Sequence, residues 1–208
     1  MSQSIKSRGI VLKTKDAKGA DRFYIIYTKD FGKVFVKAAG VKKPVSKLSG
    51  HLEPFCLSEF FIARGKKINR LAGAKQVECF YNLKKDYEKI SVASYLCEIY
   101  DELIKDESPD RDLYEILEFN LKYLNENDIN WIVIKASILK ILSKMGYEPI
   151  LEEKSDINKI IKFFIYEDFE NITKLRLSDE LWKEISKKID FMLKKQLEEN
   201  LQTEKFLL

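Results

Sequence analysis

A lysine-rich loop is the first stretch of this sequence with a clear chemical capability. Between Gly40 and Gly50 it carries Lys42, Lys43 and Lys47 and no acidic residue. Glycine allows the backbone to adopt unusual conformations, and lysine neutralises phosphate charges. The composition therefore suits a loop across which a phosphate backbone lies. A solvated surface loop has a similar composition, because lysines are mostly exposed.

The charges of the chain are divided unevenly along its length. Residues 1–80 hold 17 Lys and Arg against 6 Asp and Glu, a net charge of +11. Residues 81–208 hold the remaining 20 and 27, a net charge of −7, so the whole chain carries only +4. This asymmetry predicts two domains, 1–80 and 81–208, with different roles. The basic one is a candidate surface for nucleic acid.

Signs of catalysis are weak. The single histidine, His51, lies beside Gly50 without an identifiable partner, so a surface or turn histidine is the favoured interpretation. The chain contains neither a G-x-x-x-x-G-K-[ST] phosphate loop nor a G-x-G-x-x-G motif. Its carboxylates are scattered among lysines rather than paired for a two-metal site. We therefore expect a binding protein, not an enzyme, with no cofactor.

The cysteines and the apolar segments bear on the cellular compartment. Cys56, Cys79 and Cys97 are odd in number and far apart, which argues against a disulfide framework and against a zinc site built from cysteine pairs. They are expected to be reduced core residues of a cytoplasmic protein. The sequence shows neither a signal peptide nor a membrane span, so no membrane association is expected.

The basic half reads as five strands. Alternating apolar residues and intervening turns predict strands at residues 7–14, 22–28, 33–39, 53–64 and 68–80. Gly32 in a short turn makes the second and third strands a hairpin. Five short strands with a long connection after the third fit an OB-fold barrel, which binds single strands through a cationic groove and aromatic stacking faces.

The candidate nucleic-acid contacts come from these strands and their loops. The candidate cations are Arg22, Lys33, Lys37, Lys42, Lys43, Lys47, Arg64, Lys66, Lys67 and Arg70. The candidate stacking residues are Phe23, Tyr24, Phe35 and Phe61. An aromatic side chain on a strand is more often a core residue, so the cations are more informative as a group.

The second half has helical periodicity, which makes the predicted class α+β: a barrel followed by an all-α domain. A helix is expected from Asp86, a second capped by Ser108, and a third from Asp128 to Gly146 that is apolar almost all round. Residues 156–166 and a long segment capped by Ser178 complete the set. The long helix carries two lysine pairs, Lys187–Lys188 and Lys194–Lys195. Two interpretations are open: the pairs extend the basic surface, or, as we favour, they form a solvated helix face.

Several sequence islands in the first 80 residues resemble the RecO family of bacterial recombination mediators and strand-annealing proteins. They are residues 9–14 (GIVLKT), 20–22 (ADR), 32–34 (GKV), 40–46 (GVKKPVS) and 52–55 (LEPF). The resemblance continues more weakly at residues 146–151 (GYEPIL) and 191–207.

The resemblance implies a protein that binds single-stranded DNA, anneals complementary strands and helps to load recombinase in the nucleoid. It also implies RecR and the acidic tail of single-strand-binding protein as partners. Two departures stand out. Residues 152–156 (EEKSD) lack the zinc-binding cysteines that many members carry, so no zinc is expected. Phe35 and Ala39 stand where basic residues are expected, with Lys37 between them.

Two other functions remain open on the sequence alone. A metal-dependent nuclease would cleave labelled strands in the presence of Mg²⁺ or Mn²⁺. An RNA-binding OB-fold protein would prefer RNA in competition with DNA, a preference that net charge cannot predict.

Overall fold

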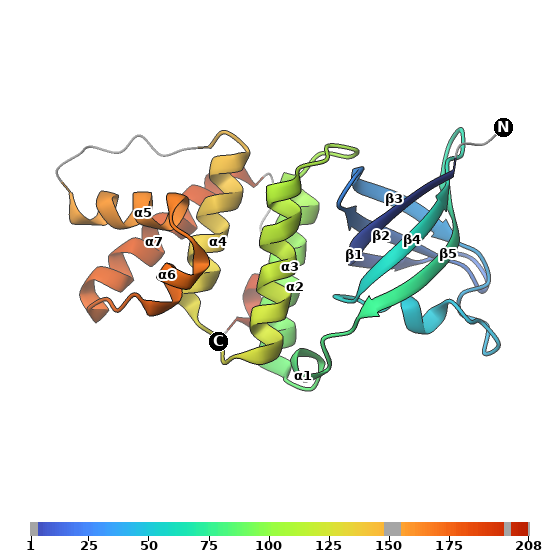
Figure 1. Ribbon diagram of the computed structural model, residues 1–208, viewed down its shortest axis with the longest axis horizontal. Helices are drawn as coiled ribbons and strands as arrows, with labels where there is room; N and C mark the ends of the chain where they lie inside the picture. Colours follow the sequence, from blue (N-terminus) through green and yellow to red (C-terminus); the bar gives the residue numbers. More distant parts are fainter. Residues whose placement is uncertain (1–3, 148–154, 198–200, 208) are drawn as a thin grey trace. The chain divides into compact units, whose positions relative to one another are not determined.

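The structure is a computed structural model that describes residues 4–147, 155–197 and 201–207. Five strands come first along the chain and helices follow (Figure 1). The strands are β1 (Ser4–Asp16), β2 (Arg22–Thr28), β3 (Gly32–Ala38), β4 (Leu57–Ala63) and β5 (Asn69–Glu78). A short 3-10 helix, η1 (Ser49–His51), lies in the long connection between β3 and β4.

The strands close into a barrel in the order β1-β2-β3-β5-β4, with β4 pairing back onto β1. Neighbours are antiparallel except β3 and β5, which run parallel over a short stretch. The long connection before β4 makes this parallel pairing possible, since antiparallel neighbours need only a hairpin. The α+β class and the OB-like barrel are therefore confirmed.

Alternating side chains on β2 and β3 help to fill the barrel. On β3, Val34, Val36 and Ala38 are buried while Phe35 is exposed. Tyr24 and Ile26 on β2 point into the same apolar core. This period-two pattern leaves the other side of β2 and β3 for contacts outside the barrel.

The observed strands differ from the predicted bounds at every strand except β2, and most at β1 and β4. β1 is longer than residues 7–14 because it pairs with β4 over its first half and with β2 over its second. β4 starts at Leu57, not at residue 53, since Phe55 adopts a left-handed backbone conformation (φ 65°) that ends extended structure before it.

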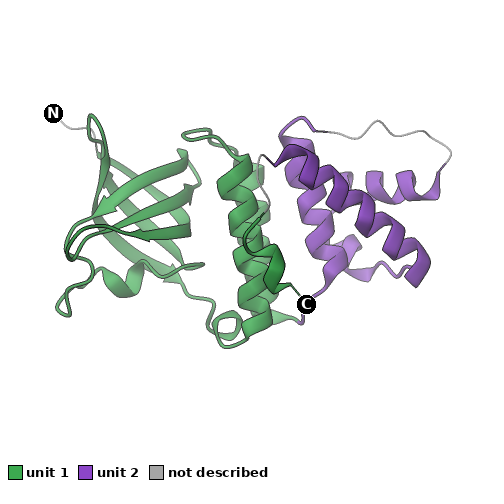
Figure 2. Cartoon of the chain, turned by 180° about the vertical axis from the view of Figure 1, so that it is seen from behind, with its two compact units in different colours: residues 1–127, 201–208 green, residues 128–200 purple. Residues whose placement is uncertain are grey.

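The chain forms two compact units, coloured separately in Figure 2. Unit 1, residues 1–127 and 201–208, joins the barrel to α1 (Tyr81–Lys84), α2 (Tyr87–Leu103), α3 (Arg111–Glu126) and η2 (Glu204–Phe206). Unit 2, residues 128–200, holds α4 (Trp131–Lys144), α5 (Asp156–Tyr166), α6 (Phe169–Lys174) and α7 (Asp179–Gln196). The predicted division at residue 80, as a boundary between folding domains, stays a prediction.

Within unit 1 the barrel packs on α2 and α3 through tyrosines. The ring of Tyr27 on β2 meets that of Tyr100 on α2 edge-on at 5.3 Å between centroids. The Tyr100 hydroxyl donates to the carbonyl of Leu113 on α3 at 2.6 Å. At Gly32 (φ 67°) a Cβ atom would lie 2.5 Å from the backbone of Ser108, so only glycine fits this approach.

Two predicted helix starts are wrong by a few residues. The cap of α3 is Asp110, not Ser108, and its carboxylate accepts from the amide of Leu113 at 3.0 Å. The cap of α4 is Asn130, not Asp128. In both cases a residue of equal capping ability two positions later makes the bond.

In unit 2, α4 packs against α5, α6 and α7. Gly146 (φ 82°) ends the α4 segment as predicted, and α5 and the Ser178 cap of α7 are also confirmed. The short helix α6 was not predicted. Residues 148–154, which include most of the 146–151 motif and the stretch without cysteines, lie outside the described residues, as do residues 198–200. Among the helices described, none is long and apolar enough to cross a membrane.

Candidate nucleic-acid interface

The outer face of β2 and β3 carries an aromatic platform. The register places Phe23 opposite Lys37 and Ile25 opposite Phe35, and all four side chains point away from the core. The rings of Phe23 and Phe35 stack at 5.1 Å with an interplanar angle of 18°, and Phe35 is 41% exposed. OB-folds bind oligonucleotides on this face, and exposed rings offer stacking surface to any base.

Cations flank the platform on the side of β5. The short parallel pairing of β3 with β5 sets Lys37 beside Arg70. The turn before β5 carries Lys66 and Lys67, both exposed. In OB-folds the loop between the fourth and fifth strands borders the binding face, so these two lysines occupy the position from which a bound backbone is contacted.

The lysine-rich loop is fastened to the turn between β1 and β2. The Lys42 amide donates to the carbonyl of Ala20 at 2.9 Å, and the Gly40 amide donates to a carboxylate oxygen of Asp21 at 2.8 Å. Lys43 and Lys47 remain exposed on this loop. These two hydrogen bonds therefore fix the start of the loop to the turn between β1 and β2.

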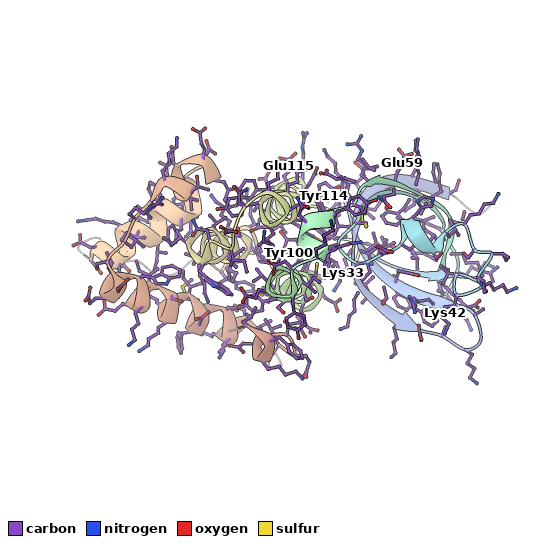
Figure 3. The ribbon with its side chains drawn as sticks, turned by 90° about the horizontal axis from the view of Figure 1, so that it is seen from below. Lys33, Lys42, Glu59, Tyr100, Tyr114 and Glu115 are labelled. Carbon is purple, nitrogen blue, oxygen red and sulfur yellow. The ribbon has the colours of Figure 1, made fainter. Side chains whose placement is uncertain are left out.

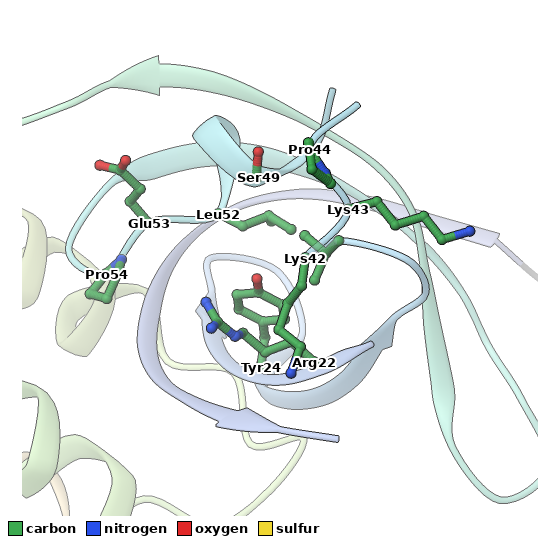
Figure 4. A pocket seen from close by; sticks show the side chains of 10 residues that line it. Arg22, Tyr24, Lys42, Lys43, Pro44, Ser49, Leu52, Glu53 and Pro54 are labelled. Carbon is green, nitrogen blue, oxygen red and sulfur yellow. The ribbon is translucent and has the colours of Figure 1, made fainter. Parts of the chain in front are cut away.

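A pocket of about 470 Å³ opens between this loop and the start of β2. Figure 4 shows the Tyr24 ring in the middle of the lining, with Arg22 beside it. Three cations and one carboxylate contribute to the walls, together with apolar and small residues: Arg22, Lys42, Lys43, Glu53, Tyr24, Val41, Pro44, Ser49, Leu52 and Pro54. Its charge favours an anionic group.

Two carboxylates order the cations at this end of the barrel. Asp16 accepts from the Arg22 guanidinium at 2.8 Å and lies 3.4 Å from the Lys42 ammonium. Asp21 pairs with Lys37 at 2.8 Å. Arg22 and then Lys42 lower the pKa of the Asp16 carboxyl, and Lys37 lowers that of Asp21, so both stay ionised at neutral pH. Three cations against two anions keep this cluster positive.

Lys33 and Arg64 lie elsewhere. Lys33 is 9% exposed, and its ammonium donates to the Asp101 carbonyl and lies 3.6 Å from the carboxylates of Asp101 and Asp106. Arg64 pairs with Glu107 at 3.3 Å. Both therefore hold the barrel to the α2–α3 side, and Figure 3 shows Lys33 beside the helices and Lys42 at the far side of the barrel. We place neither in the interface.

The four aromatic candidates separate in the same way. Phe23 and Phe35 form the platform, whereas Tyr24 is 2% exposed and belongs to the barrel core. Phe61 is 39% exposed but lies on β4 opposite Lys6, whose ammonium sits 5.3 Å from the ring. The pairing of Phe23 with Phe35 depends on the hairpin register, which the sequence alone does not supply.

His51 connects two elements of the barrel. The imidazole Nδ1 of His51 accepts from the amide of Gln76 at 3.4 Å, which links η1 to β5 as a turn histidine would. Sequence reasoning missed Asp16 and Asp21 as site residues. Their position at the ends of the turn between two basic strands is the signal that points to them.

Family models match both parts of the chain. "Recombination protein O N terminal" covers residues 1–80, and "Recombination protein O C terminal" covers residues 84–161. The chain belongs to the RecO family. The first RecO model thus spans the whole barrel, from β1 to β5, with the platform and the lysine-rich loop.

Relatives named "DNA repair protein RecO" are similar over most of the chain. That of Syntrophomonas wolfei is 32% identical over 71% of this chain and 59% of its own length. Those of Dehalococcoides mccartyi and Clostridium perfringens are 30% and 35% identical over 74% and 69% of this chain, and over 61% and 58% of their own length. The match thus spans about three fifths of each of these RecO relatives.

Proposed function

We propose that this chain works in DNA repair and recombination by binding single-stranded DNA on the outer face of β2 and β3. The observation that carries the proposal is the stacked pair of Phe23 and Phe35 on the face that OB-folds use for oligonucleotides, where Phe35 is exposed and Phe23 is half-buried. Lys37 and Arg70 stand next to the rings, so bases and phosphates have separate and adjacent partners.

Binding of this kind does not read sequence. Aromatic rings stack on every base, and lysine and arginine neutralise phosphates whatever base they carry. The salt bridges of Asp16 and Asp21 hold the charged groups of Arg22, Lys37 and Lys42 in place before DNA arrives. A strand entering along the platform can then continue towards the pocket and the lysine-rich loop.

Strand annealing follows from charge neutralisation without a catalytic group. Two complementary strands repel each other through their phosphates, and a cationic surface reduces that repulsion while the bases stay accessible. The protein therefore acts as a binding protein, and a nucleoid-associated one, rather than as an enzyme. By membership of the RecO family, we extend the proposal to recombinase loading with RecR and with the acidic tail of single-strand-binding protein as partners.

An annealing experiment tests the proposal. Two complementary oligonucleotides with a donor and an acceptor dye are mixed, bare or coated with single-strand-binding protein, with and without this protein. We expect faster annealing in its presence and a loss of the effect at high salt. An annealing rate that the protein leaves unchanged, together with no binding to a single labelled strand, refutes the proposal.

The same material separates the two alternatives. A labelled strand incubated with Mg²⁺ or Mn²⁺ stays intact if the protein only binds, whereas persistent cleavage by the pure protein indicates a nuclease. Unlabelled DNA and RNA oligomers of equal length then compete for the site. Stronger competition by RNA points to an RNA-binding role instead.

A further inference from the structure

Two thiols meet at the end of the barrel where the chain leaves for α1. Cys56 directly precedes β4 and Cys79 directly follows β5, and the register pairs Leu57 with Glu78. The antiparallel pairing therefore brings the two cysteines opposite each other. Their sulfur atoms lie 2.8 Å apart, and both are free thiols.

A lysine and a glutamate lie against this thiol pair. The Lys84 ammonium is 3.0 Å from the Cys56 sulfur and 2.6 Å from a carboxylate oxygen of Glu53. Cys56 is fully buried, whereas Cys79 is partly exposed. Burial, helped by the hydrogen bond with Cys79, raises the pKa of the Cys56 thiol to about 12, so Cys56 stays protonated. We therefore assign the first oxidation to Cys79, the less buried residue of the two.

We propose that Cys56 and Cys79 form a reversible two-electron redox site that a peroxide converts into an intramolecular disulfide. The sulfur atoms need to approach by only about 0.75 Å to reach the bond length of about 2.05 Å. Cys56 and Cys79 directly flank the paired residues Leu57 and Glu78, so this pairing already holds the two thiols together.

The reaction balances with hydrogen peroxide as the oxidant. The Cys79 sulfur attacks one peroxide oxygen, the O–O bond breaks, and Cys79 sulfenic acid and one water form. The Cys56 sulfur then attacks the Cys79 sulfur, the S–O bond breaks, and the hydroxide leaves as a second water with the proton of the Cys56 thiol. Two thiols are oxidised and one peroxide is reduced to two waters, and a dithiol reductant reverses the change.

The same residues are less suited to a metal ion. Among the described residues, Glu53, Cys56 and Cys79 form a group whose ligand atoms all lie within 4.8 Å of one another. Structural zinc is held by four ligands, and here the Lys84 ammonium already bridges the carboxylate and the Cys56 sulfur. The contact between the two sulfurs favours a sulfur–sulfur bond instead.

Peptide mapping of the full chain tests the proposal. After treatment with hydrogen peroxide and alkylation of the remaining thiols, trypsin releases residues 48–64 with Cys56 and residues 76–84 with Cys79. We expect these two peptides to be joined, the number of reactive thiols in the unfolded protein to fall from three to one, and a reductant to restore all three. The disulfide also raises the melting temperature by about 5–10 °C, since it constrains the unfolded chain.

Cys97→Ala is the matched control, because Cys97 is a buried cysteine without a neighbouring thiol in the described structure. We expect this variant to form the same joined peptides, and Cys79→Ala to form none. Three thiols that persist after peroxide treatment overturn the proposal, as do peptides joined only between molecules. Stoichiometric Zn²⁺ that protects two thiols from alkylation in the reduced protein also overturns it and indicates a metal site.

Discussion

Neutralising the lysine-rich loop is the sharpest perturbation of the proposed interface. We consider the triple variant Lys42→Gln, Lys43→Gln and Lys47→Gln. The fold tolerates it, because the loop is attached through backbone groups: the amide at position 42 still donates to the Ala20 carbonyl. Asp16 keeps its 2.8 Å contact with Arg22 after the Lys42 ammonium is removed.

The size of the effect follows from counterion release. Single-stranded DNA gives a slope of log K against log salt of about −0.7 for each phosphate neutralised. If the interface neutralises about five phosphates, the slope is about −3.5, and loss of three cations reduces it to about −1.4. At about 0.1 M salt the affinity then falls by about 100-fold, which corresponds to about 2.8 kcal/mol.

Fluorescence anisotropy of a labelled thymidine oligomer, recorded at several salt concentrations, measures both the affinity and the slope of log K against log salt. The matched control is Lys183→Gln, Lys187→Gln and Lys195→Gln on α7, which removes the same charge from exposed positions of unit 2. We expect the control to bind almost like the unaltered chain. An unchanged slope in the loop variant, or an equal loss in the control, refutes the assignment of the binding surface to this loop.

Three further predictions concern single residues. Phe35→Ala removes the exposed ring of the platform and should weaken binding by about 1–3 kcal/mol without changing the salt slope, as anisotropy will show. Gly32→Ala places a Cβ atom 2.5 Å from the Ser108 backbone and should lower the melting temperature measured by circular dichroism. Glu98 accepts three hydrogen bonds from Gln202 and Thr203, and although burial opposes it, they lower its pKa. The hydrogen bonds of Glu98 therefore stabilise the attachment of residues 201–207 to α2 at pH values above the ordinary carboxyl pKa. This stabilisation is lost as the pH falls through the lowered pKa of Glu98. Glu98→Ala should accelerate hydrogen exchange in residues 201–207 at neutral pH, and unchanged exchange contradicts this.

The barrel was predictable because its signals are local. Alternation at Val34, Val36 and Ala38 and glycine at position 32 identify the hairpin from the sequence alone. The helix starts were less predictable, because Ser108 and Asp110 are both good caps and the sequence does not show which of them accepts from the Leu113 amide.

The site was predictable in kind but not in detail. Charge counting identified the basic half of the chain. It could not show that the Lys33 ammonium forms ion pairs with Asp101 and Asp106, which lie about 70 positions later in the sequence. The partners of a buried lysine depend on tertiary packing, which periodicity does not encode. For the same reason the contact between Cys56 and Cys79 was not foreseen: it requires the register of β4 with β5.

The return of residues 201–207 to unit 1 has a consequence for synthesis on the ribosome. The barrel and its helices emerge first, but the segment that Glu98 binds leaves the exit tunnel only after the whole of residues 128–200. Unit 1 is therefore finished last although it begins first. A nascent chain stalled within residues 128–200 carries the complete barrel while its α2 helix still lacks that final partner.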